Sequence, residues 1–591
     1  MPRSWIRPSI VLLVVVGLLA LPSAGIAQPQ AEQTPTAEGT GGAAATVDLL
    51  ATQAAVEALR NGANAVDAAV VAAAVLGVVE PFSCGIGGGG FMVIRTAGGK
   101  VTTIDHRETA PAAMHPGSFI NPATGTPLPF AEARWSGLSA GVPGTVEGWD
   151  EALQRYGTMS LGEALQPAIE IARDGFLVDQ IFFGQIQGNV DFFDDITSTR
   201  ALYLDPDGTP RDVGTTFPNP DMARTYERIA YLGAKGFYRG AVADAMVNAV
   251  QSPPLTPTAN HVWRPGVMTM RDLHTYVAPE RTPTKVSYRG LDVYGMGPPS
   301  SGGSTDGEAL NILEGFTLSP ADRARAFHLF IEASRLSFAD RGAFLADPDF
   351  FPVPLTGLLS DSFAAERRAL INPTQATPSP VAPGNPHPHN TPGQAAATAL
   401  TGGGTTHLTV SDSDGNVVSY TFTIESIGGN GIVVPGWGFL LNNELTDFDF
   451  GSPLHPNKVE GGKRPRSSMS PTIVLEDDEP LLAFGSPGGS MIITTVLQVL
   501  LDRLDLGATL PGAIAAPRAS QRNTTTTVAE PAFVSSMLGQ QLASQYLQPF
   551  STTPEIGAVT GIEFLGNGRV LAAAEPTRRG GGSAMVVTPT P

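Results

Sequence analysis

A glycine-rich junction at residues 402–410, GGGTTHLTV, divides the chain into two parts of different character. The tract before it, INPTQATPSPVAPGNPHPHNTPGQAAATALT (371–401), is rich in proline, which is excluded from helix interiors and from central strands. After it, the sequence follows the alternating pattern of a half-buried strand. A plain linker gains nothing from three glycines placed directly against two hydroxyl-bearing residues, whereas a backbone cleavage site needs both. The junction is therefore a candidate site of self-cleavage between Gly404 and Thr405.

Cleavage at this bond would give Thr405 a free α-amine beside its own hydroxyl. A threonine hydroxyl is a weak nucleophile that needs a base. A terminal amine has an unperturbed pKa of about 7.7–8.0, so near neutral pH part of it can accept a proton. Nucleophile and base then belong to one residue, and no Ser-His-Asp set is required. The alternative is a glycine-rich turn before an ordinary strand, since threonine is a good strand former; taken alone, the TTH stretch favours this alternative.

Two further stretches could supply the rest of a catalytic site. GSPGGS (485–490) follows a strand and opens a helix, so the amides of Gly488 and Gly489 can form an oxyanion hole; the alternative is a plain turn. Arg107, in TIDHRETAP, can hold a substrate carboxylate through two hydrogen bonds, although a lone arginine is more often a surface charge or a salt-bridge partner. SCGIGGGG (83–90) precedes a strand instead of opening a helix, which argues against a dinucleotide loop.

Composition and the N-terminus restrict the partners and the compartment. The formal net charge of −19 argues against nucleic acid or an anionic membrane surface as a partner. Arg3 and Arg7 precede an apolar run (10–21) and the small-residue stretch PSAGIA, the order of a secretory signal cleaved after Ala27. A membrane anchor is the alternative, but the run is short for a bilayer. We expect an exported protein, periplasmic or extracellular, with no membrane contact after signal removal. The single cysteine, Cys84, excludes an internal disulfide.

The expected organisation is a signal (1–27), a disordered leader (28–45), a first part (46–404) whose Pro-rich end is flexible from about residue 372 to 404, and a second part (405–591). Alternating stretches on either side of AGG (97–99), SDG and DDEP predict three hairpins, and packed helices follow the later strand pairs. These features indicate a layered α+β fold. The nine histidines show no metal-ligand spacing, and we expect no metal and no cofactor.

Nine motifs, in order, resemble those of a gamma-glutamyltranspeptidase: NGANAVDAAV, GIGGGGF, DHRETAP, PGTVEGW, PPSSGG, TTH, LLNNELTDF, KRPRSSMSPTIV and GSPGGS. The resemblance covers roughly residues 47 to 588. It implies an N-terminal-nucleophile hydrolase fold, a four-layer αββα sandwich, made as a proenzyme that cleaves itself into a large and a small subunit. These subunits would form a heterodimer, and the small subunit would comprise residues 405–591.

The resemblance also implies roles by position. Thr405 would be the nucleophile in both self-cleavage and turnover, and Thr423 would hydrogen-bond it. The substrate α-carboxylate would be held by Arg107, Ser467 and Ser468, its α-ammonium by Glu425, Glu444 and Asp447, and the oxyanion by Gly488 and Gly489. A γ-glutamyl donor such as glutathione would acylate Thr405. Water, an amino acid or a peptide would then accept the glutamyl group.

The sequence departs from the family pattern at two places. These are the residues that would hold the substrate ammonium and the loop that covers the site in several family members. Residues 425 and 444 are both Glu where well-known bacterial members have Asn and Gln. With Asp447 this places three carboxylates near one ammonium, which should raise at least one carboxyl pKa. Only 19 residues separate Asp447 from Ser467, too few for the lid loop of several members. We therefore expect an open cleft that admits bulky donors and acceptors.

Two other functions remain open from the sequence. An acylase of the same fold could act on glutaryl amides such as glutaryl β-lactams, but a glutaryl group has no α-ammonium and does not need three acids. A secreted binding protein could keep the scaffold without catalysis, but it would be expected to have lost the nucleophile or the carboxylate-binding residues, and both are present.

Overall fold

The structure is a computed structural model that describes Met1 and residues 33–387 and 404–590. The expected signal at 2–27 and the first residues of the expected leader lie outside these ranges. No helix within the described ranges is both long and apolar enough to cross a bilayer.

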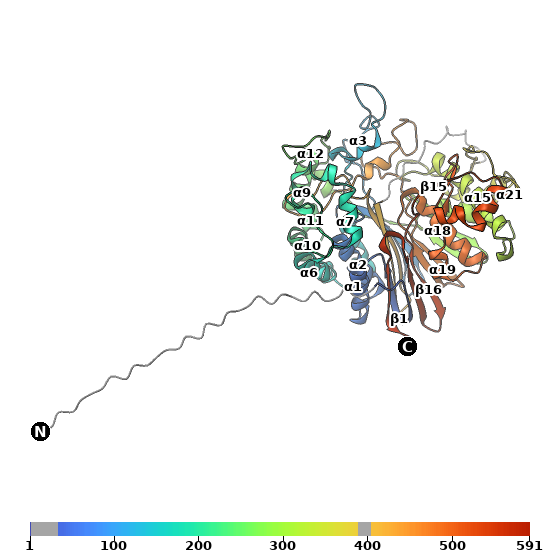
Figure 1. The fold of residues 1–591 in the computed structure, drawn as a ribbon, viewed down its shortest axis with the longest axis horizontal. Coiled ribbons are helices and arrows are strands. Elements are labelled where there is room, and N and C mark those ends of the chain that lie inside the picture. Colours follow the sequence, from blue (N-terminus) through green and yellow to red (C-terminus); the bar gives the residue numbers. More distant parts are fainter. Residues whose placement is uncertain (2–32, 388–403, 591) are drawn as a thin grey trace. The chain divides into compact units, whose positions relative to one another are not determined.

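A 13-stranded sheet runs through the centre of residues 33–590 (Figure 1). All its neighbouring strands pair antiparallel. Their order is β6-β3-β2-β10-β9-β1-β17-β16-β12-β11-β8-β7, and β18 also pairs with β1. The strands are β1 (Thr36–Thr46), β2 (Gly89–Arg95), β3 (Val101–Asp105), β6 (Glu280–Arg281), β7 (Thr284–Tyr288), β8 (Leu291–Gly295), β9 (Gly404–Asp412), β10 (Val417–Glu425), β11 (Thr472–Glu476), β12 (Glu479–Gly485), β16 (Thr560–Gly566), β17 (Arg569–Ala574) and β18 (Ser583–Pro589).

Two halves of this sheet lie face to face. The Ser419 hydroxyl on β10 donates to the carbonyl oxygen of Phe484 on β12 (3.0 Å) and accepts from the amide of Thr472 on β11 (3.0 Å). Two strand layers therefore face each other, although hydrogen bonds join all their strands into one sheet. The pairs β2–β3, β9–β10 and β11–β12 confirm the hairpins predicted from alternating residues and turn signals.

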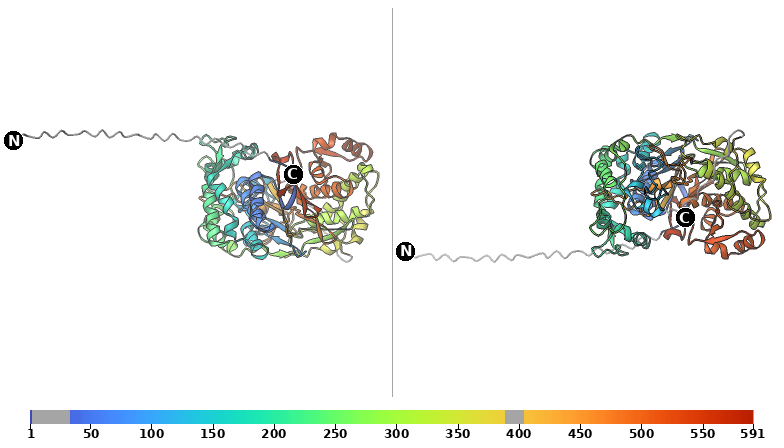
Figure 2. Two further views of the ribbon diagram at one scale, coloured as in Figure 1. Left: turned by 90° about the horizontal axis from the view of Figure 1, so that it is seen from below. Right: turned by 90° about the horizontal axis from the view of Figure 1, so that it is seen from above.

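Helices cover both sides of these layers, as Figures 1 and 2 show from three directions. The first group contains α2, which is capped by Asn64 and is buried along its whole length. It packs against Leu408 and Val410 of β9 and Tyr420 of β10. The longer helices of this group are α1 (Leu49–Arg60), α2 (Ala65–Val79), α4 (Thr145–Tyr156), α6 (Gln166–Asp174), α7 (Gln180–Gln187), α9 (Thr197–Tyr203), α10 (Pro220–Leu232) and α12 (Ala241–Gln251).

The second group packs against the opposite strand layer through Ile473 of β11 and Phe484 of β12. Its apolar helix α18 is buried on every side, as its sequence predicts. The longer helices here are α14 (Gly302–Glu314), α15 (Arg323–Phe344), α17 (Asp361–Arg368), α18 (Ile492–Leu500), α19 (Leu510–Ala515) and α21 (Met537–Gln545). The remaining helices and strands are short, between two and five residues each.

The expected disordered leader (28–45) is wrong for residues 36–45, which belong to strand β1 (Thr36–Thr46) between β9 and β17. Its sequence, TAEGTGGAAAT, lacks the bulky apolar residues that signal a strand. Small residues are required here because other backbones approach closely. A Cβ at Gly39 would lie 2.1 Å from the carbonyl oxygen of Thr588 on β18.

The first half of the Pro-rich tail also differs from expectation. Residues 372–387 form neither helix nor strand, but they are fixed by hydrogen bonds to the second part of the chain. The amide of Ala376 donates to the carbonyl of Tyr546 (2.7 Å), and that of Val381 donates to the Asn523 side chain (2.7 Å). Proline removes backbone donors without preventing such loop contacts. Residues 388–403 lie outside the described ranges.

Candidate active site

The candidate active site lies at the ends of two central strands, where β9 begins and β10 ends. Gly404 pairs with Glu425 across these strands, beyond a register shift that follows Phe422. Glu425 has a φ of 76°, which is uncommon for a side chain of this kind. The two strand ends open into a pocket of about 750 Å³. The predicted residues that line it are Arg107, Thr405, Thr423, Glu425, Glu444, Asp447, Ser467, Ser468 and Gly489.

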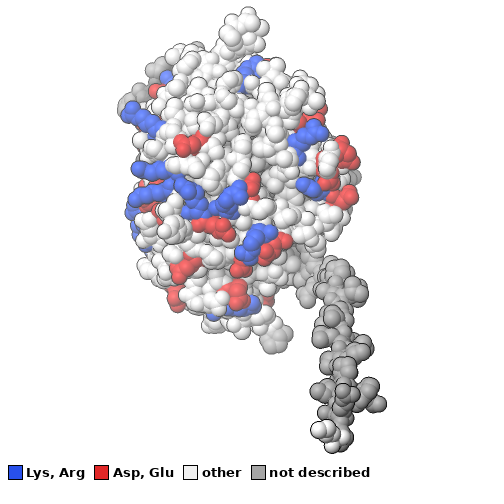
Figure 3. All heavy atoms as spheres, turned by 90° about the vertical axis from the view of Figure 1, so that its left-hand side faces the viewer, with Lys and Arg blue, Asp and Glu red and all other residues white. Residues whose placement is uncertain are grey.

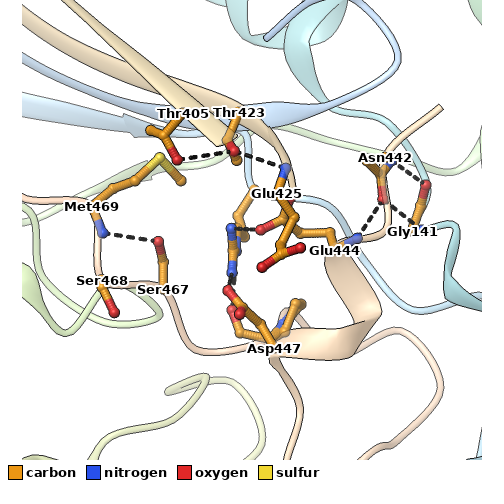
Figure 4. A network of polar contacts seen from close by, with 12 residues as sticks. Gly141, Thr405, Thr423, Glu425, Asn442, Glu444, Asp447, Ser467, Ser468 and Met469 are labelled. Atoms are coloured by element: carbon orange, nitrogen blue, oxygen red, sulfur yellow. Dashed lines mark hydrogen bonds and ion pairs between the residues drawn. The ribbon is translucent and has the colours of Figure 1, made fainter. Parts of the chain in front are cut away.

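The intact Gly404–Thr405 bond sits within a compact hydroxyl network, in which the hydroxyls of Thr405 and Thr423 lie side by side (Figure 4). The Thr405 hydroxyl donates to the carbonyl oxygen of Gly404 (2.6 Å), and the Thr423 hydroxyl donates to the same oxygen. The two hydroxyl oxygens are 3.2 Å apart. Both side chains are buried. The predicted nucleophile is therefore next to the bond it would cleave, and Thr423 polarises that bond.

The predicted oxyanion glycines form the turn between β12 and α18. Gly488 and Gly489 have φ values of 134° and 58°, which L side chains rarely adopt. No described residue accepts a hydrogen bond from either amide. Gly489 lines the pocket with Thr405. The Gly489 amide, an unused donor at the pocket that contains Thr405, and the Gly488 amide before it are therefore candidates for an oxyanion hole.

Arg107 is buried, and its guanidinium is engaged by the protein itself. It forms ion pairs with Glu444 and with Asp447, the latter at 2.6 Å. Its Nε donates to the carbonyl of Pro465 (3.1 Å). Burial opposes its charge, but the attraction of Glu444 and then Asp447 outweighs burial and raises the pKa of Arg107. The sequence prediction placed Arg107 on the substrate carboxylate and did not anticipate these pairs.

The three predicted acids differ in their surroundings. Burial, and then repulsion by Asp447, raise the pKa of Glu425 to about 7 against hydrogen bonds from Ser426 and Asn443. Burial also raises the pKa of Glu444, which Arg107 opposes. The Asp447 side chain is 36% exposed. The expected rise in carboxyl pKa is confirmed, although desolvation contributes more than repulsion between the acids.

Ser467 and Ser468 lie across the pocket from Glu425 and Glu444 (Figure 4). The Ser467 hydroxyl accepts from the amide of Met469 (3.1 Å), so its own proton is free to reach a ligand. The Ser468 hydroxyl accepts from Nη2 of Arg341 (2.7 Å), a residue of α15. Each serine can therefore still donate into the pocket.

Several residues that line the pocket or hold its side chains in place were not assigned from the sequence. Asn442 accepts from the Glu444 amide (3.0 Å) and so fixes the short turn that carries Glu444. Asn443 donates to the Glu425 carboxylate. Both lie in the quoted motif LLNNELTDF, so their positions were marked but their roles were not. Arg341 lies in helix α15, 64 positions before Thr405. The sequence pattern of this helix indicates that it is buried and gives no sign of a role at the site.

Two histidines near the site, His106 and His407, are buried, which favours a structural role for both. His407 bonds the hydroxyls of Thr421 (2.7 Å) and Thr409 (3.1 Å), and burial lowers its pKa to about 3. Burial likewise lowers the pKa of His106 to about 3. Across the described ranges, no three His, Cys, Asp or Glu side chains gather into a group that could hold a metal ion.

A threonine at a strand start, beside a second threonine and in a pocket that contains Gly489 and three acids, has the groups that acyl transfer requires. The family model for gamma-glutamyltranspeptidase matches residues 51–585. The chain belongs to the gamma-glutamyltranspeptidase family. Within this family, the glutathione hydrolase proenzyme of Bacillus subtilis strain 168 is 40% identical over 491 residues, covering 81% of this chain and 80% of the relative. The glutathione hydrolase proenzyme of Pseudomonas sp. strain A14 is 35% identical over 562 residues, covering 91% and 93%.

A solved structure extends the likeness of this gamma-glutamyltranspeptidase family member to an acylase. Cephalosporin acylase from Bacillus halodurans superposes with a TM-score of 0.81 at 28% identity, covering 95% of this chain and 98% of that one. The mixed α/β fold is thus shared with N-terminal-nucleophile hydrolases that carry different names.

Proposed function

We propose that this protein is a self-cleaving gamma-glutamyltransferase and glutathione hydrolase. The observation that carries the proposal is the pair of hydroxyls, from Thr405 and Thr423, on the carbonyl oxygen of Gly404. The proenzyme names of its relatives support a cleaved form. Cleavage would give a large and a small subunit that stay together as a heterodimer, within a four-layer αββα sandwich. We further propose that the chain is exported.

Self-cleavage would begin with attack of the Thr405 hydroxyl oxygen on the carbonyl carbon of Gly404. Thr423 would donate to the carbonyl oxygen as it becomes negative. The carbon–nitrogen bond then breaks, the nitrogen of Thr405 takes a proton, and an ester joins Gly404 to the Thr405 oxygen. Water hydrolyses this ester, which leaves a carboxylate on Gly404 and a free α-amine on Thr405. That amine is the base that the hydroxyl needs in turnover.

Turnover would repeat this chemistry on a γ-glutamyl amide. The Thr405 amine takes the hydroxyl proton, the oxygen attacks the γ-carbonyl, and the Gly488 and Gly489 amides stabilise the oxyanion. The leaving amine takes the proton and departs, which leaves a glutamyl ester on Thr405. Water or an acceptor amine then attacks this ester, releasing glutamate or a new γ-glutamyl product. No cofactor takes part in these steps.

The substrate α-ammonium would lie among Glu425, Glu444 and Asp447, and its α-carboxylate against Ser467, Ser468 and the outer edge of Arg107. Because Arg107 is bound to Glu444 and Asp447, it would also set the positions of these two acids. Arg107 thus has two proposed roles, one toward the substrate and one toward the acids.

A glutaryl acylase is the second candidate, and the likeness to cephalosporin acylase favours it. The presence of Glu425 and Asp447 in the pocket favours a substrate with an ammonium. The deciding experiment compares kcat/KM for γ-glutamyl-4-nitroanilide and glutaryl-4-nitroanilide, with Thr405→Ala as the inactive control. We expect the glutamyl substrate to be at least about tenfold faster, the value of one good charge-assisted contact. A faster glutaryl substrate would overturn the glutamyl assignment.

A further inference from the structure

Three arginines gather around Ser468 and Ser490 at the pocket, and two of them, Arg341 and Arg466, are also within electrostatic reach of Asp447. Arg341 donates to the Ser468 hydroxyl (2.7 Å) and to that of Ser301 (2.7 Å). Arg522 donates to the Ser490 hydroxyl, which follows the oxyanion glycines. Arg466 donates only to backbone carbonyls, among them that of Arg341 (3.2 Å).

None of these three guanidinium groups forms an ion pair with a described carboxylate. Their like charges are close enough to act on one another: burial, then Arg466, and also Arg522, lower the pKa of Arg341, against the attraction of Asp447. On the face in Figure 3, basic side chains lie next to acidic ones, and many surface arginines of the chain have acidic partners, such as Arg155 with Glu151.

Each guanidinium keeps a terminal nitrogen without a described acceptor: Nη1 of Arg341, Nη2 of Arg466 and Nη2 of Arg522. Arg341 and Arg466 line the pocket directly, and Arg522 reaches its wall through Ser490. Arg341 and Arg522 are 6% and 8% exposed, so their charges are shielded from bulk water. Partly desolvated arginines with unused donors are suited to carboxylates.

We propose that Arg341, Arg466 and Arg522 form a second carboxylate subsite, which binds an acid group on the leaving amine or on the incoming acceptor. The α-carboxylate of the glutamyl group shares a carbon with the α-ammonium, so it must stay near Glu425 and Asp447. Ser490 directly follows the glycines proposed to bind the reacting carbonyl. It would therefore lie at the end of the acyl chain opposite the α-carboxylate. A carboxylate reaching Arg522 therefore belongs to the amine side of the scissile bond.

This inference rests on the proposed γ-glutamyl transfer and names a preference within it. Amines that carry a carboxylate, such as amino acids and peptides with a free C-terminus, would be favoured as leaving groups and as acceptors. An uncharged aromatic amine would gain nothing from the subsite. The arginines would thus select the amine partner, while the acids select the acyl group.

The test compares kcat/KM for γ-glutamyl-4-nitroanilide and its 3-carboxy derivative, which differ by one carboxylate on the leaving group. We expect the unaltered protein to prefer the carboxylated substrate by about tenfold or more, and this preference to fall as salt rises. In Arg522→Gln the preference should fall to about one, because the carboxylated substrate loses more than the uncharged one. Arg522→Lys should keep part of it. Arg173→Gln, an exposed arginine paired with Asp174, should retain all of it.

The possible results separate this inference from the proposed function. Turnover of the uncharged substrate by the unaltered protein tests γ-glutamyl transfer alone. If the unaltered protein shows no preference for the carboxylated substrate, the subsite proposal is overturned, even if Arg522→Gln fails to fold. Equal losses on both substrates in Arg522→Gln would also overturn it, because the arginine would then act on the acyl group or on the fold. Self-cleavage of each variant reports whether it has folded.

Discussion

Arg107 shows how a residue's type can be read from the sequence while its partners cannot. The motif DHRETAP predicted a carboxylate-binding arginine, and the structure places Arg107 in the pocket. Its contact with Glu444 spans 337 positions of sequence, and it depends on where β3 and the Glu444 turn meet. No local pattern reports such a contact. The sequence therefore predicted that Arg107 belongs to the site, but not which carboxylates it pairs with there.

The buried Arg107–Glu444 pair predicts that substitutions of these two residues have non-additive effects on the free energy of unfolding. Both side chains are 1% exposed, so Arg107→Gln leaves Glu444 buried without its positive partner. We expect this variant to lose about 3–5 kcal/mol of unfolding free energy. Adding Glu444→Gln should restore most of the loss, as measured by denaturant unfolding in a double-mutant cycle. Additive losses in the double variant would show that the pair does not stabilise the fold.

Glu425 predicts a pH dependence of ligand binding. Its raised pKa, about 7, means that the carboxyl is largely neutral below pH 7 and becomes charged above it. Only the charged form attracts an ammonium, so the inhibition constant of glutamate should fall as pH rises through 7. Glutarate, which lacks the ammonium, serves as the matched ligand, and Glu425→Gln should abolish the difference in slope. Parallel pH profiles for the two ligands in the unaltered protein would refute this role.

At the scale of elements, turn chemistry and alternation predicted the three hairpins, because both signals are local. Strand β1 was missed because its glycines and alanines carry no strand signal, although their small size is what lets β18 pack closely. A chain that begins at Val47, and so lacks β1, should not fold or cleave itself, since β9 would lose a neighbour. A chain that begins at Gln33 should do both. Soluble yield and gel analysis of cleavage test this, and normal cleavage without β1 would contradict it.

Gly404 at the start of β9 predicts a defect confined to self-cleavage. A Cβ there would lie 2.4 Å from the backbone carbon of Ser426 and 2.6 Å from the amide nitrogen of Ile427. Gly404→Ala must therefore displace the scissile carbonyl, and we expect cleavage to slow by about 10²-fold. After cleavage, residue 404 is no longer joined to Thr405, so the cleaved fraction should keep its normal kcat. Gly184→Ala, with open space around its Cβ, is the control; unimpaired cleavage of Gly404→Ala would disprove the crowding argument.

At the scale of the whole molecule, the strand order could not be predicted from the sequence. β1 lies between β9 and β17, and the neighbours on both sides are hundreds of positions away. This order nevertheless decides the site, because it brings Thr405, Glu444 and Gly489 from separate segments to one pocket. The family resemblance supplied that arrangement as an expectation, whereas periodicity and spacing supplied only the elements.

The most direct test of self-cleavage before Thr405 is the intact mass and N-terminal sequence of the purified protein, expressed without residues 1–27. We expect two chains, and the smaller should contain the 187 residues 405–591 and begin Thr-Thr-His-Leu. The Thr405→Ala variant should remain a single chain. A single chain in the unaltered protein after long incubation, or a cut at another bond, would contradict the central claim that Thr405 becomes an N-terminal nucleophile.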